Sequence, residues 1–127
     1  MSEKKGAIVF DIDGTICIQC DGDYDSLEPY PEAKEIINKL YDEGYYIIFN
    51  TSRFMGRCKN DVMKVYREHY SFMKKQLESW GIKFHELHMG KPRADVYVDD
   101  KALGHNTDWK IIEQEIRKVV DNKEKKV

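Results

Sequence analysis

The sequence predicts an α/β domain built on a parallel sheet that is sandwiched by helices. Apolar, β-branched runs at residues 7–10 and 45–50 lack polar alternation, which is typical of strands buried on both faces of a parallel sheet. Segments with apolar residues at helical spacing separate and follow these runs, so strands and helices alternate along the chain. A chain of 127 residues is long enough for one such domain.

The first half of the chain supplies a strand, a loop, a helix and a second strand. The polar loop of residues 18–30 follows the first strand, and we expect it to be a mobile flap. A helix begins near Pro31, because proline lacks the N–H that a first helical turn leaves unpaired, and it ends at Gly44. The second strand then covers residues 45–50.

The second half of the chain continues the alternation. A long helix with an apolar stripe covers residues 60–80, and strands are expected at residues 82–87 and 94–98. The last helix runs over residues 108–120, with Thr107 as its N-cap.

Composition indicates a single globular domain. No repeat or linker divides the chain, so residues 1–120 are expected to form one domain and residues 121–127 a frayed, charged tail. Hydrophobic residues make up 41% and charged residues 35%, and the net charge of -2 gives no basic excess for nucleic acid. No apolar run approaches the ~20 residues of a transmembrane helix, and no signal peptide precedes the first strand. We therefore expect a cytoplasmic protein without a nucleic-acid or membrane partner.

The cysteines and histidines leave two interpretations open. Cys17 and Cys20 form a Cys-x-x-Cys pair, which is a candidate redox pair or, together with His85 and His88, a candidate zinc site. The spacing is a weak signal, and with Cys58 the cysteines are odd in number. We favour loop-packing thiols and surface histidines.

Polar side chains gather at the ends of the predicted strands. They are Asp11 and Asp13 after the first strand, Thr51, Ser52 and Arg53 after the second, Lys91 before the fourth, and Asp99 and Asp100 after it. The carboxyl ends of parallel strands meet at one edge of a sheet, where ligands bind. Acids that share a site repel one another unless a cation joins them, and oxygen-only ligands favour Mg²⁺. A cation, a lysine and a hydroxyl around an aspartate are the groups that catalyse phosphoryl transfer.

These motifs resemble those of the haloacid dehalogenase (HAD) superfamily phosphatases over residues 6–109. The motifs are Asp11-Ile12-Asp13-Gly14-Thr15, Thr51 closing an apolar strand, Lys91, and the acidic pair Asp99-Asp100. The resemblance implies a Rossmann-like core. About fifteen residues separate Thr15 from the first helix, so the chain resembles the members that have no cap domain.

The resemblance implies a role for each motif residue. Asp11 would be the nucleophile, forming an aspartyl-phosphate, and would also bind Mg²⁺. Asp13 would be the acid/base, and its main-chain carbonyl would bind Mg²⁺. Thr51 and Lys91 would hold the phosphoryl oxygens, and Ser52 would offer at most its backbone N–H.

The remaining motif residues have less definite roles. The acidic pair would complete the metal site, and we favour Asp100 as the direct ligand, with Asp99 binding through water or orienting the lysine. Arg53 follows a phosphate-binding position, so it is a candidate substrate contact, with a structural salt bridge as the equal alternative.

A closer likeness exists to small bacterial phosphatases encoded with capsule or surface-polysaccharide genes. It rests on residues 51–53, 90–92 and 98–102, and it implies a phosphorylated sugar, polyol or amino alcohol as substrate. Without a cap, the site would admit large substrates, or a neighbouring subunit would supply a lid. Several aromatic and methionine side chains are candidates for the pocket or such an interface, although core packing is the commoner explanation: Phe54, Met55, Tyr66, Tyr70, Phe72 and Met73.

Other functions fit the sequence less well. A nucleotide or nucleic-acid 3′-phosphatase conflicts with the acidic charge balance. A non-catalytic binding module would usually have lost Asp11 or Asp13. A phosphomutase normally needs a cap, and dehalogenases lack the second aspartate.

Overall fold

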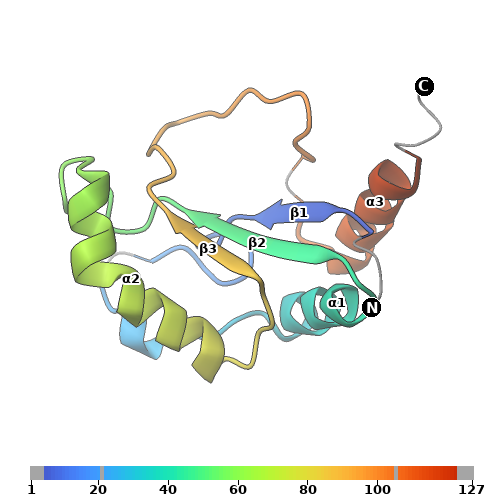
Figure 1. Ribbon diagram of the computed structural model, residues 1–127, viewed down its shortest axis with the longest axis horizontal. Helices are drawn as coiled ribbons and strands as arrows, with labels where there is room; N and C mark the ends of the chain where they lie inside the picture. The colour runs from blue at the N-terminus through green and yellow to red at the C-terminus, as the bar shows by residue number, and fades with distance from the viewer. Residues whose placement is uncertain (1–4, 21, 105, 123–127) are drawn as a thin grey trace.

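The computed structural model describes residues 5–20, 22–104 and 106–122, which form a parallel sheet with helices against it (Figure 1). The elements are β1 (Ala7–Phe10), a short 3-10 turn (Tyr24–Ser26), α1 (Pro31–Asp42), β2 (Tyr46–Thr51), α2 (Val62–Ser79), β3 (Glu86–Met89) and α3 (Trp109–Asn122). Within the described residues, the sheet has the order β1-β2-β3, and both pairings are parallel. The predicted α/β class and parallel sheet are therefore confirmed.

The helices pack on one face of this sheet. Phe10, Phe49 and Leu87 stand side by side in register and are all buried. The alternate positions face the other way, where Val9 is 59% exposed and His88 is also exposed. We expected helices on both faces. The described residues instead leave the second face partly open.

Aromatic rings join the helices to the sheet. The Phe10 ring lies 6.1 Å from Phe49 and 5.8 Å from Trp109 of α3, measured between centroids. The Phe84 ring contacts Phe49 edge-on. These contacts form the centre of the core and fix the end of β1, where the first motif begins.

The predicted strand at residues 94–98 is absent, which corrects the sequence-based expectation. Its apolar side chains are exposed, with Val96 at 72% and Val98 at 96%, and residues 91–104 run as a loop (Figure 1, orange). Within the described chain, β1 pairs on one side only, with β2. An alternating apolar pattern supplies faces for burial, but a strand also needs a partner for its backbone hydrogen bonds.

Other element boundaries move by a few residues. The third strand begins at Glu86 rather than at residue 82, because Ile82 and Phe84 insert into the core before the chain joins the sheet. The cap of α3 is Asp108 rather than Thr107, since the Asp108 carboxylate accepts the Lys110 N–H at 2.9 Å. The helix continues to residue 122, so the start of the expected tail is helical, and residues 123–127 lie outside the described part.

The loop of residues 18–30 is attached to the helix that follows β2. The indole of Trp80 donates to the Leu27 carbonyl at 3.0 Å, and Leu27 is itself buried. Residue 21 lies outside the described part. Leu27 is therefore packed against the end of α2, while most of the described residues 22–30 are exposed, so the mobile flap stays a prediction.

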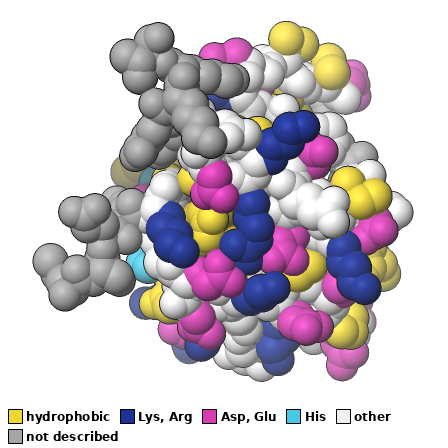
Figure 2. Space-filling view, turned by 90° about the vertical axis from the view of Figure 1, so that its right-hand side faces the viewer, with side chains coloured by type: hydrophobic (Ala, Val, Ile, Leu, Met, Phe, Trp, Pro, Cys, Tyr) yellow, Lys and Arg dark blue, Asp and Glu magenta, His cyan; other side chains and the backbone are white. Residues whose placement is uncertain are grey.

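The surface on the α1 and α3 side carries charges of both signs, interspersed (Figure 2). Arg117 of α3 forms an ion pair at 2.7 Å with Glu43 at the end of α1, which ties the two helices together, and a second one at 2.7 Å with Glu113 within α3. No helix among the described residues combines the length and apolar character needed to cross a membrane.

Candidate active site

Asp11 stands directly after β1 at the carboxyl edge of the sheet. One of its carboxylate oxygens accepts the Ile12 N–H at 2.9 Å, and the other lies 3.8 Å from the Lys91 ammonium. Burial raises the pKa of Asp11, and the positive charge of Lys91 opposes that effect. A half-buried carboxylate beside an ammonium is suited to attack an anionic group, because the lysine offsets the repulsion between the two anions.

The backbone brings Lys91 to this position. The Lys91 N–H bonds to the Thr51 carbonyl at 3.1 Å, which continues the β2–β3 pairing one step past the end of β3. Gly90 precedes it with a φ of 92°, in the left-handed region that favours glycine. A Cβ on Gly90 would lie 2.7 Å from Val62, so this close crossing also requires glycine.

Thr51 ends β2 and is 1% exposed. Its hydroxyl oxygen accepts the Arg53 N–H at 3.0 Å, which turns the chain sharply after the strand. A hydroxyl that accepts one hydrogen bond still has a hydrogen of its own to donate. Ser52 is half-buried at the same edge. The structure therefore brings the first two motifs and Lys91 together.

Arg53 is held by Asp13. Its guanidinium donates to both carboxylate oxygens of Asp13, at 2.8 and 2.7 Å, in the bidentate geometry that gives strong charge-assisted bonds. The Arg53 side chain is 0% exposed and that of Asp13 is 9% exposed. The sequence left a substrate contact and a structural salt bridge open for Arg53, and the structure shows the salt bridge.

Gln76 completes this cluster and was missed by the sequence analysis. Its amide oxygen accepts from Arg53 at 2.6 Å, and its amide nitrogen donates to the Tyr24 carbonyl at 2.5 Å. The signal was present, because an amide at residue 76 lies between Met73 and Leu77 on the apolar stripe of the helix. A polar residue on a buried stripe indicates a specific hydrogen-bond partner.

Cys17 borders the same carboxylate. Its sulfur lies 3.5 Å from an Asp13 oxygen and the side chain is fully buried. Burial, and secondarily the charge of Asp13, raise the pKa of the Cys17 thiol to about 12. A thiol in this state packs and donates, and it is a poor nucleophile.

The acidic pair is not at the site in this structure. Asp99 and Asp100 are exposed, and the Asp99 carboxylate accepts the Lys101 N–H at 2.8 Å within its own loop. Across the described residues, no group of His, Cys, Asp or Glu has the arrangement of a metal site. The donors present fit Mg²⁺ in part. Asp11 and the main-chain carbonyl of Asp13 are hard oxygen ligands, but the set is incomplete without the acidic pair.

The zinc alternative finds no support in the geometry. His85 stands before β3, where its ring stacks on Tyr41 and Tyr46 and accepts the Ile47 N–H at 3.0 Å. That position is at the opposite end of the strands from Cys17. Among the described residues, the cysteines are free thiols.

The aromatic and methionine residues after β2 belong mostly to the core. Phe54, Met55 and Met73 are buried, while Tyr66, Tyr70 and Phe72 pack partly buried against them. The Tyr66 hydroxyl accepts the Met89 N–H at 3.0 Å and so anchors α2 to β3. Phe54 stacks on His69, with ring centroids 3.8 Å apart.

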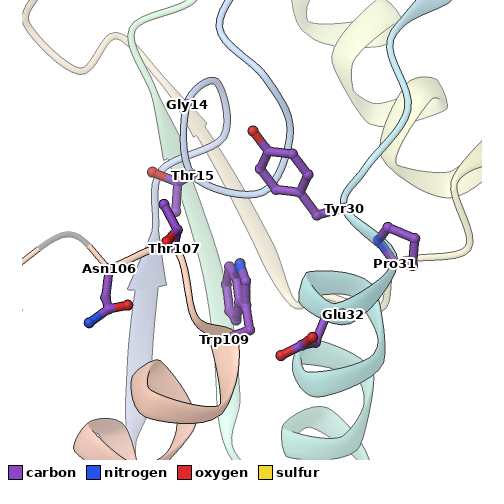
Figure 3. Close-up of a pocket in the computed structure, with 8 residues that line it drawn as sticks. All are labelled: Gly14, Thr15, Tyr30, Pro31, Glu32, Asn106, Thr107 and Trp109. Atoms are coloured by element: carbon purple, nitrogen blue, oxygen red, sulfur yellow. The ribbon is translucent and has the colours of Figure 1, made fainter.

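A hollow of about 380 Å³ lies beside the turn that follows Asp13 (Figure 3). The turn at Gly14 and Thr15, the start of α1 and the start of α3 enclose it. Its described lining includes the carboxylate of Glu32 but no lysine or arginine, so it is poorly suited to a phosphate group.

Comparison with known proteins shows the fold alone. No family model and no curated protein matches the chain. A structural-genomics target from Vibrio cholerae superposes with a TM-score of 0.73 at 22% identity, covering 91% of this chain and 97% of that one. A D,D-heptose 1,7-bisphosphate phosphatase from B. bronchiseptica, complexed with magnesium and phosphate, gives a TM-score of 0.47 at 18% identity and covers 91% of this chain and 63% of that one. The second TM-score is too low to carry an argument.

Proposed function

We propose that this chain is a Mg²⁺-dependent phosphomonoester hydrolase that acts through an aspartyl-phosphate. The observation that carries the proposal is the Asp11 carboxylate 3.8 Å from the Lys91 ammonium, with the Thr51 hydroxyl at the same strand edge. The resemblance of the motifs to HAD phosphatases supports the same reaction. The substrate class we propose is a small phosphorylated sugar, polyol or amino alcohol, bound without nucleic acid or membrane.

The reaction has two steps. In the first, an Asp11 oxygen attacks phosphorus, the bond to the leaving oxygen breaks, and Asp13 gives that oxygen a proton. In the second, water attacks the phosphorus of the aspartyl-phosphate, its proton passes to Asp13, and the bond to the Asp11 oxygen breaks. Lys91 and Thr51 hold the phosphoryl oxygens throughout.

Asp13 carries a proton during part of this cycle. Both of its oxygens accept from the Arg53 fork in the structure described here. A carboxyl group that carries a proton has one O–H to donate and keeps lone pairs that accept, so Asp13 can donate to the leaving oxygen while Arg53 still holds it.

The proposed metal site uses Asp11, the Asp13 carbonyl and Asp100, with Asp99 nearby. Bound Mg²⁺ would neutralise phosphoryl charge and orient the substrate. Because Asp99 and Asp100 are exposed in the loop of residues 91–104, this proposal requires that loop to bring them toward Asp11.

The biological setting is proposed on the likeness to capsule and surface-polysaccharide phosphatases. We propose a cytoplasmic role in supplying such a pathway with a dephosphorylated precursor. The same likeness includes no cap domain, and a second copy of the chain is the proposed source of a lid.

The test is phosphate release from p-nitrophenyl phosphate with and without Mg²⁺. We expect Mg²⁺-dependent turnover that falls by about 10³-fold or more in Asp11→Asn, since the nucleophile is lost. Glu35→Gln, an exposed carboxylate on α1, is the matched control and should retain wild-type turnover. Unchanged activity in Asp11→Asn would refute the nucleophile assignment. A 3′-phosphorylated oligonucleotide hydrolysed faster than every sugar, polyol and amino-alcohol phosphate would favour the 3′-phosphatase alternative.

A further inference from the structure

Gln76 is a buried amide whose two polar ends are both used. The residue is 8% exposed, its oxygen accepts from Arg53 at 2.6 Å and its nitrogen donates to the Tyr24 carbonyl at 2.5 Å. Burying an amide is unfavourable unless it is hydrogen-bonded, and these bonds join α2 to two loops distant in sequence. Ordinary core packing would be served as well by leucine or methionine at this position.

The amide fixes the orientation of the Arg53 guanidinium. One terminal nitrogen bonds to Gln76, while the other terminal nitrogen and Nε bond to Asp13. The Tyr24 ring lies 4.4 Å from the guanidinium carbon and supports the group from one side. With three nitrogens engaged and the side chain fully buried, Arg53 has one orientation in which it satisfies its neighbours.

That orientation determines where the Asp13 carboxylate lies. Asp13 is two residues after Asp11, and its side chain makes its ion pair with Arg53. A general acid must lie within hydrogen-bond reach of the leaving oxygen, so a small displacement of its carboxylate lowers the rate. Only the Arg53 guanidinium lies between the Gln76 amide and the Asp13 carboxylate.

We propose that Gln76 is a positioning residue for proton transfer. It acts through Arg53 to hold the Asp13 carboxylate where it serves the leaving oxygen. The inference rests on the proposed phosphatase function, and it assigns to α2 a part in the chemistry that the four motifs do not contain.

Two substrates with different leaving groups distinguish a positioning role of Gln76 from general damage to the fold. An alkyl phosphate has a poor leaving group that needs the acid, whereas 2,4-dinitrophenyl phosphate releases a stable anion without one. The quantity kcat/KM reports steps through the first irreversible one, departure of the leaving group. It is therefore insensitive to the later role of Asp13 as a base.

The experiment measures kcat/KM for glycerol 2-phosphate and for 2,4-dinitrophenyl phosphate in the full chain. Gln76→Met keeps the length of the side chain and removes both hydrogen bonds. We expect about a tenfold loss on the alkyl substrate, equivalent to about 1.4 kcal/mol, and less than a twofold loss on the aryl substrate. Gln76→Asn keeps the amide but shortens its reach, and it should show the same selectivity if Gln76→Met folds poorly.

Two further variants calibrate the result. Asp13→Asn removes the acid and should give a larger loss with the same selectivity. Leu77→Val loosens the neighbouring fully buried position without a hydrogen bond to Arg53, so it should change both substrates by the same factor.

The outcomes distinguish the two proposals. If the Gln76 variants lose activity equally on both substrates while Asp13→Asn is selective, Gln76 is only structural and the inference is overturned. If Asp13→Asn itself shows no selectivity, the assignment of Asp13 as acid fails, and the inference fails with it. Absence of Mg²⁺-dependent hydrolysis in the wild-type chain would overturn the phosphatase proposal itself.

Discussion

The candidate site has two halves that differ in construction. The braced half consists of Asp13, Arg53 and Gln76, whose side chains are buried and joined by hydrogen bonds of 2.6 to 2.8 Å. The open half consists of Asp99 and Asp100 in the loop of residues 91–104, which are both exposed, and the Asp99 carboxylate accepts a bond from Lys101 of the same loop. The two halves contain the same kind of carboxylate, and their surroundings make the difference.

Pairing of the preceding strand fixes the position of a functional side chain in this fold. Asp13 and Arg53 follow strands that are paired with each other, so the sheet brings their loops together before any ligand binds. Asp99 and Asp100 follow a segment that has no strand partner, so no backbone register places them. Sequence motifs identify Asp13 and the acidic pair equally well, but they do not report this difference in anchoring.

Removing the central cation of the braced half should have the largest effect on stability. Arg53→Met leaves the Asp13 carboxylate and the Gln76 oxygen without their donor in a buried position, so we expect a loss of about 3–5 kcal/mol in the free energy of unfolding. Urea denaturation measures it. Arg93→Met, an exposed arginine of the open loop, is the control and should change that free energy by less than about 0.5 kcal/mol. Equal losses in the free energy of unfolding in the two variants would show that the two halves do not differ in their contribution to stability.

Alkaline pH should weaken the braced half through Cys17. The folded chain raises the thiol pKa to about 12, from an ordinary value near 9, so its protonated form contributes stability that is lost as pH rises between these values. Between pH 9 and pH 11 we expect this thiol to lower the free energy of unfolding by about 2–3 kcal/mol. Denaturation at several pH values should show a shallower decline in Cys17→Ala. Cys20→Ala is the control, and a slope unaltered by Cys17→Ala would contradict the prediction.

Substitutions in the open half should change the Mg²⁺ requirement of the activity without changing the free energy of unfolding. Asp100→Asn should raise the Mg²⁺ concentration for half-maximal activity about tenfold, equivalent to about 1.4 kcal/mol, because a charged ligand is lost. Its free energy of unfolding should stay within about 0.5 kcal/mol of the wild type. Activity titrations with Mg²⁺ measure the first quantity. Asp99→Asn, whose residue is proposed to act less directly, should show a smaller shift, and an unchanged Mg²⁺ requirement in both variants would argue against the acidic pair.

The smallest effect is expected at the most exposed apolar residue. Val98 is 96% exposed, so Val98→Ala should change the free energy of unfolding by less than about 0.5 kcal/mol. Val65 is 0% exposed on α2, so the same substitution there should cost about 1–3 kcal/mol. A loss above about 1 kcal/mol at Val98 would mean that the loop is packed, and the comparison of the two halves would then fail.

Local sequence signals predicted most of the fold. Pro31 and Gly44 mark the limits of α1 within two residues, and the apolar run at 45–50 locates β2 within one. The strand expected at 94–98 was wrong, because its alternation of apolar residues carries no information about whether a neighbouring strand will pair with it. The helices on both faces were inferred from strand–helix alternation, which does not by itself say on which face each helix packs.

The candidate site was predictable in its chemistry and less so in its contacts. Asp11 and Lys91 were expected together, and they lie 3.8 Å apart. The bond between Arg53 and Gln76 spans 23 positions, and that between Arg53 and Asp13 spans 40, so no local pattern encodes either. Only the presence of an amide on an apolar stripe indicated that residue 76 had a buried partner.

The backbone at Gly90 sets where Lys91 and the loop that carries the open half leave the sheet. It is the last residue before Lys91, its φ is 92°, and Val62 leaves no room for a side chain on it. The direction in which residues 91–104 leave the sheet therefore depends on a single backbone angle that other residues rarely adopt. Lys91 and Asp100 both follow Gly90, but the Lys91 N–H is bonded to the Thr51 carbonyl at 3.1 Å, so the lysine is fixed to the sheet. A movement of the acidic pair toward Asp11 therefore has to come from residues 92–99, which lie beyond that bond.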